Sequence, residues 1–266
     1  MFKKAFVYCV IILLAVAFSS CSKYSRIQKS QDFQLKYEKA SDYYDEKDFY
    51  RAMTLFDQVM PFYRGKTEAE DIAYKYAYSY YYQKEYILAS YHFSRFAQTY
   101  PRNPKSEECS FMAAYCKYLE SPIYKLDQKN TREAIEELQL FLNSYPNSER
   151  LDQCNTLIDE LREKLQKKDF EIAKLYLKMD KYNAAVTAFK NLMIQYPDTK
   201  YREEALFYSI KAYYFYASRS VKDKRQERYR KALDIYEEFV LLYPGSRYRR
   251  DAEAMADWSK KNIDNL

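Results

Sequence analysis

The stretch Ala89–Pro101, ASYHFSRFAQTYP, decides the fold, because its spacing of apolar residues returns along the chain. Counting back from Tyr100, Phe96 lies four residues earlier, Phe93 seven and Ala89 eleven. These offsets put the side chains on one stripe of an α-helix, and the following proline ends that helix. The same frame occurs in four further stretches: Ala52/Phe56/Val59/Tyr63, Ala134/Leu138/Phe141/Tyr145, Ala185/Phe189/Leu192/Tyr196 and Ala232/Tyr236/Phe239/Tyr243. The sequence therefore predicts an array of repeats.

An earlier helix in several repeats carries a small residue and an aromatic residue at fixed distances, as in Ala40/Tyr43, Ala77/Tyr80 and Ala173/Tyr176. This pattern resembles the tetratricopeptide repeat, a helix–turn–helix unit of about 34 residues. The resemblance implies an all-α solenoid of about five helix–turn–helix repeats, wound as a right-handed superhelix. We expect the repeats near residues 33–64, 66–101, 104–146, 147–197 and 198–244, followed by a helix at 246–264. Residues 125–130 and 218–227 are expected to be loops, and the fourth repeat to have a lengthened first helix.

The first twenty residues are predicted to be a lipoprotein signal peptide. Lys3 and Lys4 precede an apolar run at residues 7–18, which is too short to span a bilayer comfortably. Small residues then precede Cys21, which resembles a bacterial lipobox, and this resemblance implies that Cys21 is acylated and becomes the N-terminus. Residue 22 is a serine, which favours the outer membrane. The polar residues 21–32 are predicted to be a flexible tether ahead of a repeat domain at 33–266. An ordinary secretory leader with a chance cysteine is the alternative.

The composition argues against several classes of enzyme and cofactor site. The chain has two glycines, whereas phosphate-binding and dinucleotide-binding loops depend on glycine. His92 is the only histidine, so neither a Ser/His/Asp set nor a Cys/His metal site can be assembled. We expect no catalytic residue, no metal ion, no cofactor and no enzymatic activity.

Three cysteines remain after the lipid site. Cys109 and Cys116 lie seven residues apart on one predicted helix, so their Cα atoms are about 10 Å apart, too far for a disulfide. Either could reach Cys154 on a neighbouring helix, but the odd number of cysteines argues against it. We interpret all three as small buried hydrophobic residues.

Two surfaces are candidates for binding. First helices line the concave groove of tetratricopeptide arrays, and here they carry an aromatic set: Tyr37, Tyr44, Tyr74, Tyr78, Tyr81 and Tyr82. In the fourth repeat the corresponding face carries Phe170, Lys174, Leu177 and Lys178. Tyrosine rings with hydroxyl ends suit an extended, aromatic-rich peptide, although packing between repeats is an equal alternative.

The second candidate surface is basic and lies in segments 222–231 and 247–250. Its arginines are Arg225, Arg228, Arg230, Arg247, Arg249 and Arg250. An acidic protein partner is the functional interpretation, and solvated helix ends are the alternative. Acidic residues interleave with the basic ones, and exported proteins rarely meet nucleic acid, so no nucleic-acid binding is expected.

A more specific resemblance concerns two later stretches. Ser121-Pro122, Leu126-Asp127-Gln128 and the residues from Thr131 to Ser148 look like the third repeat of the outer-membrane assembly lipoproteins of the BamD family. Residues 205–229, up to a charged loop, are similar to the fifth repeat of Bacteroidetes-type members. The resemblance implies a non-catalytic, lipid-anchored periplasmic subunit of the complex that inserts β-barrel proteins into the outer membrane. Its C-terminal repeats would bind POTRA domains of the central barrel subunit, and its N-terminal repeats unfolded barrel substrates.

Two alternatives stay open. One is another periplasmic tetratricopeptide lipoprotein, such as a coordinator of cell division and cell-wall synthesis, although these usually carry an N-terminal coiled coil. The other is a nutrient-binding outer-membrane lipoprotein, although these usually have large inserted loops.

Overall fold

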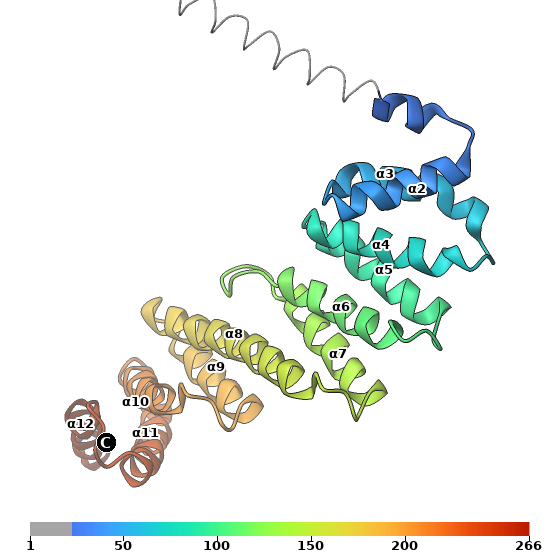
Figure 1. The fold of residues 1–266 in the computed structure, drawn as a ribbon. Coiled ribbons are helices and arrows are strands. Elements are labelled where there is room, and N and C mark those ends of the chain that lie inside the picture. The colour runs from blue at the N-terminus through green and yellow to red at the C-terminus, as the bar shows by residue number, and fades with distance from the viewer. Residues whose placement is uncertain (1–22, 266) are drawn as a thin grey trace, which may run out of the picture. The chain divides into compact units, whose positions relative to one another are not determined.

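The computed structural model describes residues 23–265, and every regular element in that range is helical. Residues 23–29 form a first helical stretch. The helices that follow are α2 (Phe33–Asp45), α3 (Phe49–Tyr63), α4 (Glu68–Tyr82), α5 (Tyr86–Thr99), α6 (Ser106–Leu119), α7 (Lys129–Ser144), α8 (Leu151–Lys178), α9 (Tyr182–Gln195), α10 (Arg202–Ser218), α11 (Lys222–Leu242) and α12 (Arg249–Asp264). Figure 1 shows consecutive helices returning alongside each other as hairpin-like pairs. The predicted all-α fold of helix–turn–helix repeats is confirmed.

The chain divides into two compact units, which we describe separately. Unit 1 contains residues 23–121 and 129–155, and unit 2 contains residues 122–128 and 156–265. The division falls inside α8, after Asn155. At 28 residues α8 is the long first helix expected for the fourth repeat.

The predicted apolar stripes are buried in both units. The small residues that begin the five stripes are fully buried: Ala52, Ala89, Ala134, Ala185 and Ala232. The larger side chains four and seven residues later are buried too, except for the half-buried Tyr236. Because an alanine methyl group occupies little room, the neighbouring helix packs directly against it, and the larger side chains fill the space on either side.

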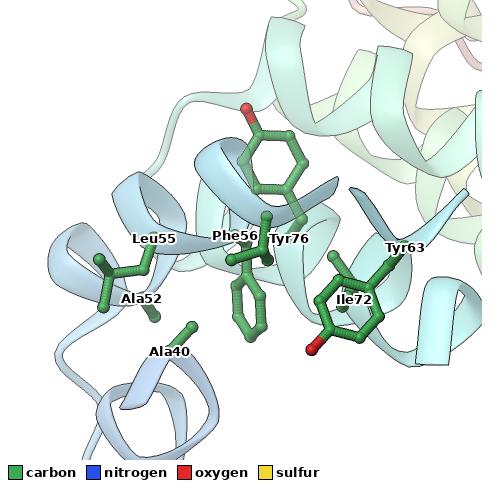
Figure 2. Close-up of a cluster of buried hydrophobic side chains, with 8 residues drawn as sticks. Ala40, Ala52, Leu55, Phe56, Tyr63, Ile72 and Tyr76 are labelled. Atoms are coloured by element: carbon green, nitrogen blue, oxygen red, sulfur yellow. The ribbon is translucent and has the colours of Figure 1, made fainter. Parts of the chain in front are cut away.

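The core of the first pair continues into the second. Figure 2 shows one buried cluster made by side chains from α2, α3 and α4, including Ala40, Ala52, Leu55, Phe56, Tyr63, Ile72 and Tyr76. Five of these seven side chains have no exposed surface. A single pair could not bury such a face alone, so each pair of unit 1 is stabilised by the next one along the chain.

The turns inside three of the pairs are built without glycine. Lys47, Lys84 and Asp180 have positive φ angles of 63°, 62° and 60°. The N–H of the following residue donates to a carbonyl oxygen five residues back, at 2.8, 3.0 and 2.9 Å, which closes the end of the first helix. These carbonyl groups belong to Tyr43, Tyr80 and Tyr176. Of the three tyrosines, Tyr176 is the most exposed, at 38%.

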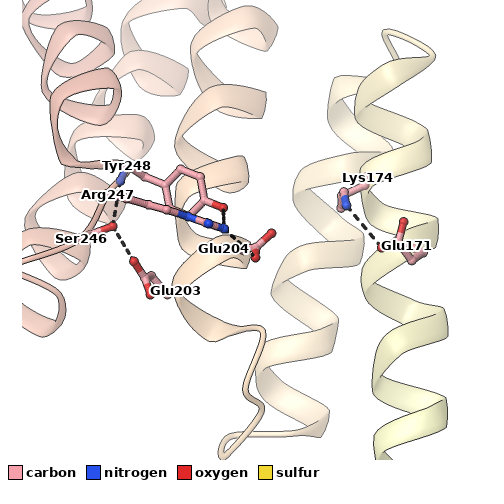
Figure 3. Close-up of polar contacts among 7 residues, drawn as sticks. All are labelled: Glu171, Lys174, Glu203, Glu204, Ser246, Arg247 and Tyr248. Atoms are coloured by element: carbon pink, nitrogen blue, oxygen red, sulfur yellow. Dashed lines mark hydrogen bonds and ion pairs between the residues drawn. The ribbon is translucent and has the colours of Figure 1, made fainter.

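A recurring corner joins successive pairs, and we call it the Tyr–Pro corner (residues 100–103, 145–148, 196–199 and 243–246). Its fourth residue is Asn103, Ser148, Thr199 or Ser246, whose side chain accepts the N–H two residues further on at 2.8 to 3.3 Å. Three of these side chains also donate to a glutamate at the start of the same pair: Asn103 to Glu70, Ser148 to Glu107 and Ser246 to Glu203. Figure 3 shows the last of these bonds. The corner therefore ties the two ends of a pair together.

The segment expected to be a flexible tether is helical where the structure describes it. Tyr24 and Ile27 pack against the buried cluster of the first pair. The Tyr24 ring lies 5.8 Å from that of Tyr43, and the Arg51 guanidinium lies 5.3 Å from the Tyr24 ring centre. The expectation is wrong for residues 23–29, because two apolar side chains three residues apart share one helix face and pack, partly buried, against the first pair. Cys21 and the predicted signal peptide lie outside the described residues.

The expectation of a loop at residues 218–227 is also wrong. Helix α10 ends at Ser218 and α11 begins at Lys222, so the connection is three residues, 219–221. Residues 222–227 contain neither glycine nor proline, and their long charged side chains favour a helix. The other expected loop is present from residue 121 to Gln128, and α7 begins at Lys129.

Candidate functional site

The six predicted groove tyrosines all belong to unit 1, on α2 and α4. The Tyr37 hydroxyl donates to Asp71 on α4 at 3.3 Å, and the Tyr74 hydroxyl donates to Glu108 on α6 at 3.1 Å. The two bonds occupy the same position in successive repeats, because donor and acceptor are 34 residues apart in each. Both hydroxyl groups therefore connect successive first helices of unit 1. The Tyr37 ring also contacts Tyr63 at 5.3 Å, and the Lys105 ammonium lies 3.9 Å from the Tyr74 ring centre, so these two rings are largely occupied by packing.

Tyr78 is part of the core. Its side chain is 8% exposed, its ring lies 4.8 Å from those of Tyr74 and Phe93, and its hydroxyl also donates to Glu108. Burial, and then the bonded Glu108 carboxylate, raise the pKa of Tyr78 far above its ordinary value. The same two causes raise the pKa of Tyr74 to about 12. Both phenols therefore stay neutral donors at physiological pH.

The remaining predicted tyrosines form a partly exposed cluster with Phe49, which we call the aromatic ledge (Tyr44, Phe49, Tyr81 and Tyr82); Tyr82 is exposed and the other three are half-buried. Tyr82 is 49% exposed, and its ring stacks on Phe49 at 4.4 Å with an interplanar angle of 22°. Phe49 also contacts Tyr44 at 5.6 Å, and Tyr81 contacts Tyr82 at 5.4 Å. The sequence reasoning missed Phe49, which begins a second helix directly after its cap residue Asp48, outside the apolar stripe.

Unit 2 has a cavity of about 710 Å³ on the first helices of its pairs, which we call the α8–α10 cavity. Lys174, Leu177 and Lys178, expected on this face, line it. Phe170 does not line it and is 2% exposed. The sequence reasoning missed the wall formed by α10: Tyr208, Lys211 and Phe215. Their spacing of three and then four residues matches that of Glu171, Lys174 and Lys178 on α8, so a search for the same stripe on the next first helix would have found them.

The α8–α10 cavity carries more positive than negative charge, because four lysine and arginine side chains face two carboxylates in its lining. Lys174 pairs with Glu171 at 3.3 Å (Figure 3) and lies 5.0 Å from the Phe170 ring centre. Arg219 pairs with Asp180 at 3.0 Å. The hydrogen bonds from Tyr182 and Arg219 hold the pKa of Asp180 below its ordinary value. With two carboxylates already paired, the cavity favours a ligand that is apolar and carries negative charge.

The six predicted docking arginines fall into two groups at opposite ends of α11. This helix has 21 residues, so it is about 30 Å long. In the first group, Arg225 donates to the Ser220 carbonyl at 2.8 Å, and the Arg228 guanidinium lies 3.7 Å from the Tyr216 ring centre. Arg230 is exposed. Arg228 also lines a cavity of about 540 Å³ with Lys190, Lys224, Glu227 and Lys231 among its walls.

The second arginine group surrounds the last Tyr–Pro corner. Arg247 pairs with Glu204 at 3.4 Å and donates to the Tyr248 hydroxyl, as Figure 3 shows. Arg249 donates to the Pro244 carbonyl at 2.8 Å, and Arg250 is exposed. The structure therefore does not bring the six arginines into one patch. Arg225, Arg228 and Arg230 lie on α11, Arg249 and Arg250 lie in the first turn of α12, and Arg247 lies in the turn before α12.

The three cysteines are buried and free, as predicted. Burial raises the pKa of the Cys109 and Cys116 thiols to about 12. His92 is half-buried and stacks on Tyr80 at 4.9 Å, and burial followed by the Arg95 charge lowers its pKa to about 4. These groups pack the interior of the repeats.

Two further findings apply to residues 23–265. No group of three or more histidine, cysteine, aspartate or glutamate residues there could hold a metal ion. No helix in this range is both long and apolar enough to cross a membrane.

Three comparisons place the chain among known proteins. Residues 29–228 match the family model YfiO, described as outer membrane lipoprotein. A stretch of 87 residues is 32% identical to the outer membrane protein assembly factor BamD of Caulobacter vibrioides, and it covers 33% of this chain and 28% of that protein.

Among solved structures, a tetratricopeptide-repeat protein from Bacteroides fragilis is similar at 16% identity and a TM-score of 0.39, covering 88% of this chain and all of the other. Kinesin light chain repeats from Podosopora anserina are similar at 14% identity and a TM-score of 0.32, covering 77% of this chain and 94% of the other. At these scores neither structural likeness carries an argument. The family model spans most of the chain, from the first helical stretch into α11, and on this ground the chain belongs to the YfiO family of outer membrane lipoproteins, the family of BamD.

Proposed function

We propose that this chain is a non-catalytic lipoprotein subunit of the outer-membrane β-barrel assembly complex. It is anchored through Cys21 at the periplasmic face of the outer membrane. Its N-terminal repeats bind unfolded barrel substrates, and its C-terminal repeats bind the POTRA domains of the central barrel subunit. The family match over residues 29–228 carries this proposal, because it includes helices of both units.

The aromatic ledge supports the substrate half of the proposal. Tyr82 and Phe49 present stacked rings, and the four residues of the ledge come from three helices of two successive pairs. Rigid rings lose little conformational entropy on binding, so they favour contacts with extended segments that carry aromatic residues. Because Tyr78 is buried beneath Tyr82, we assign recognition to the ledge residues and a packing role to Tyr78.

A paired substitution tests the ledge. Tyr81→Ala combined with Tyr82→Ala removes its two α4 rings, and we expect at least tenfold weaker binding of a peptide from the C-terminus of an outer-membrane barrel protein. Tyr91→Ala is the matched control, because Tyr91 is 57% exposed but lies on the second helix α5. Fluorescence anisotropy gives both affinities. Equal affinity of the double variant and the wild-type chain would contradict the substrate half.

The two arginine groups support the docking half of the proposal, and their separation along α11 allows each to be tested alone. Lys224→Glu with Arg230→Glu reverses two exposed charges near the start of α11, without touching the contact of Arg228 with Tyr216. Arg249→Glu with Arg250→Glu does the same beside the last corner. We expect one of the two pairs to weaken binding to the isolated POTRA domains more than tenfold, measured by calorimetry. Normal binding by both variants would rule out docking through the exposed charges at Lys224, Arg230, Arg249 and Arg250.

The complex itself is tested by purification of the tagged, full-length protein from detergent-solubilised outer membrane, with mass spectrometry of the co-purifying proteins. We expect a stoichiometric barrel protein with periplasmic POTRA domains. Recovery of cell-wall enzymes or a nutrient transporter in its place would overturn the proposed function and leave the fold standing.

A further inference from the structure

The helical stretch 23–29 has a basic face opposite its buried face. Tyr24 and Ile27 pack onto the first pair, whereas Lys23, Arg26 and Lys29 are exposed. With 3.6 residues per turn, Arg26 and Lys29 lie on the side of the helix away from the two buried side chains. The stretch contains no acidic residue. Three positive charges are therefore held at fixed positions on the outside of unit 1.

These charges are not neutralised within the described chain. None of the ion pairs found among residues 23–265 includes Lys23, Arg26 or Lys29. Acidic residues near this stretch have other partners: Asp32 caps α2 through a 2.9 Å bond, and Asp48 pairs with Arg51 at 3.1 Å. The basic face is left for an anion outside the protein.

The place of this face in the chain determines which anion it meets. Lys23 follows the predicted lipid site Cys21 by two residues, which span about 7 Å at most when fully extended. Acyl chains on Cys21 would hold the basic face at the depth of the lipid headgroups. Docking of Tyr24 and Ile27 means that the charges belong to the folded unit and not to a free tail.

We propose that Lys23, Arg26 and Lys29 bind the phosphate groups of anionic lipids in the leaflet that holds the Cys21 lipid. The anchor and the first repeat pair then form one body that lies against the membrane surface. This inference rests on the lipid anchor of the proposed function. Each basic residue near an anionic membrane surface strengthens binding about fivefold, so the three together give about a hundredfold.

The test uses the chain from residue 21 with Cys21→Ser, so that no acyl chain contributes, and co-sedimentation with vesicles. With Lys23, Arg26 and Lys29 intact, this chain should bind vesicles made of phosphatidylcholine and phosphatidylglycerol. It should bind vesicles of pure phosphatidylcholine only weakly. Lys23→Gln/Arg26→Gln/Lys29→Gln should lower the partition coefficient on the mixed vesicles by about a hundredfold. High salt should weaken wild-type binding in the same way.

A control variant distinguishes binding by the basic face from general electrostatic attraction between a basic protein and an anionic membrane. Arg64→Gln/Lys66→Gln/Arg102→Gln removes the same charge from exposed residues elsewhere in unit 1: Arg64 and Lys66 follow the far end of α3, about 20 Å from its start, and Arg102 follows α5. Unchanged binding by this control is expected, and an equal loss in both variants would overturn the proposal. Absence of a preference for phosphatidylglycerol would overturn it as well. Mass spectrometry of the protein from cells tests the anchor separately, because an unmodified Cys21 would contradict the anchor and leave the vesicle result standing.

Discussion

At the residue scale, Glu108 separates the roles of the α4 tyrosines, because it accepts hydrogen bonds from Tyr74 and Tyr78. Tyr78→Phe keeps the ring and removes the hydroxyl, so we expect it to lower the free energy of unfolding by about 1–2 kcal/mol. Tyr82→Phe removes a hydroxyl from a half-exposed ring and should change it by less than about 0.5 kcal/mol. Urea unfolding monitored by circular dichroism gives both values, and equal losses would show that Glu108 does not stabilise the fold through Tyr78.

His92 makes the stability of the fold depend on pH. Its pKa is lowered to about 4, against about 6.5 in the unfolded chain, so between these values the unfolded state binds more protons. Stability contributed by neutral His92 is therefore complete above pH 6.5 and is lost as the pH falls towards 4. At pH 5 the wild-type chain should lose about 1–2 kcal/mol relative to pH 7.5. His92→Gln should not show this part of the loss, and identical pH profiles in urea unfolding would contradict the assignment.

The sequence predicts the fully buried residues well and the half-buried ones poorly. The burial of the five stripe alanines follows from helical periodicity alone, because every copy carries larger apolar or aromatic residues four and seven positions later. Tyr78 and Tyr82 look alike in the sequence, since they lie four residues apart on one helix. What distinguishes them is Glu108, which lies on a different repeat pair. Periodicity reveals which side of a helix is apolar, but it does not reveal which hydroxyl group finds a partner on the next helix.

At the scale of elements, the Tyr–Pro corner provides the clearest prediction. The Ser148 hydroxyl accepts the Arg150 N–H at 3.1 Å in the turn just ahead of α8, and it donates to Glu107 at 2.6 Å. Ser148→Ala loses both bonds and should lower the free energy of unfolding by about 1–3 kcal/mol. Ser144→Ala is the matched control four residues earlier, where the exposed hydroxyl only donates to the Leu140 carbonyl of its own helix, and we expect almost no change. The corner has no stabilising role if the two variants unfold at the same urea concentration.

Four of the second helices end at or just before the Tyr–Pro corner that follows them, where a proline marks the end in the sequence. The failures, at residues 23–29 and 222–227, are short stretches rich in polar residues, where the pattern contains few apolar positions. Burial of Tyr24 and Ile27 stabilises the first stretch as a helix, and that contact is made with residues of the first repeat pair. The second stretch extends a helix whose apolar stripe begins only at Ala232. These stretches are helical because of a tertiary contact in one case and helix propensity in the other, and neither cause produces a periodic pattern of apolar residues in the sequence.

At the scale of the whole molecule, stability in a repeat array comes from contacts between neighbouring pairs, so damage should stay local. Phe93→Ala removes a fully buried ring from unit 1 and should cost about 3–5 kcal/mol there. Hydrogen exchange measured by mass spectrometry should then speed up in α4, α5 and α6, with α10, α11 and α12 unchanged. Phe239→Ala in unit 2 is the reciprocal variant and should give the opposite pattern. Uniform acceleration in both variants would show all-or-none unfolding.

Each Tyr–Pro corner contains a side chain that accepts a backbone N–H in the turn leading into the next helix, and three of the four side chains also reach a glutamate of their own pair. A gene segment duplicated from one corner to the next would therefore encode a helix pair together with the turn that leads into the next helix. Its insertion would require no new turn, whereas a break inside a pair would part the corner side chain from its glutamate. The corners are thus the natural points at which evolution can lengthen or shorten such a chain by whole pairs.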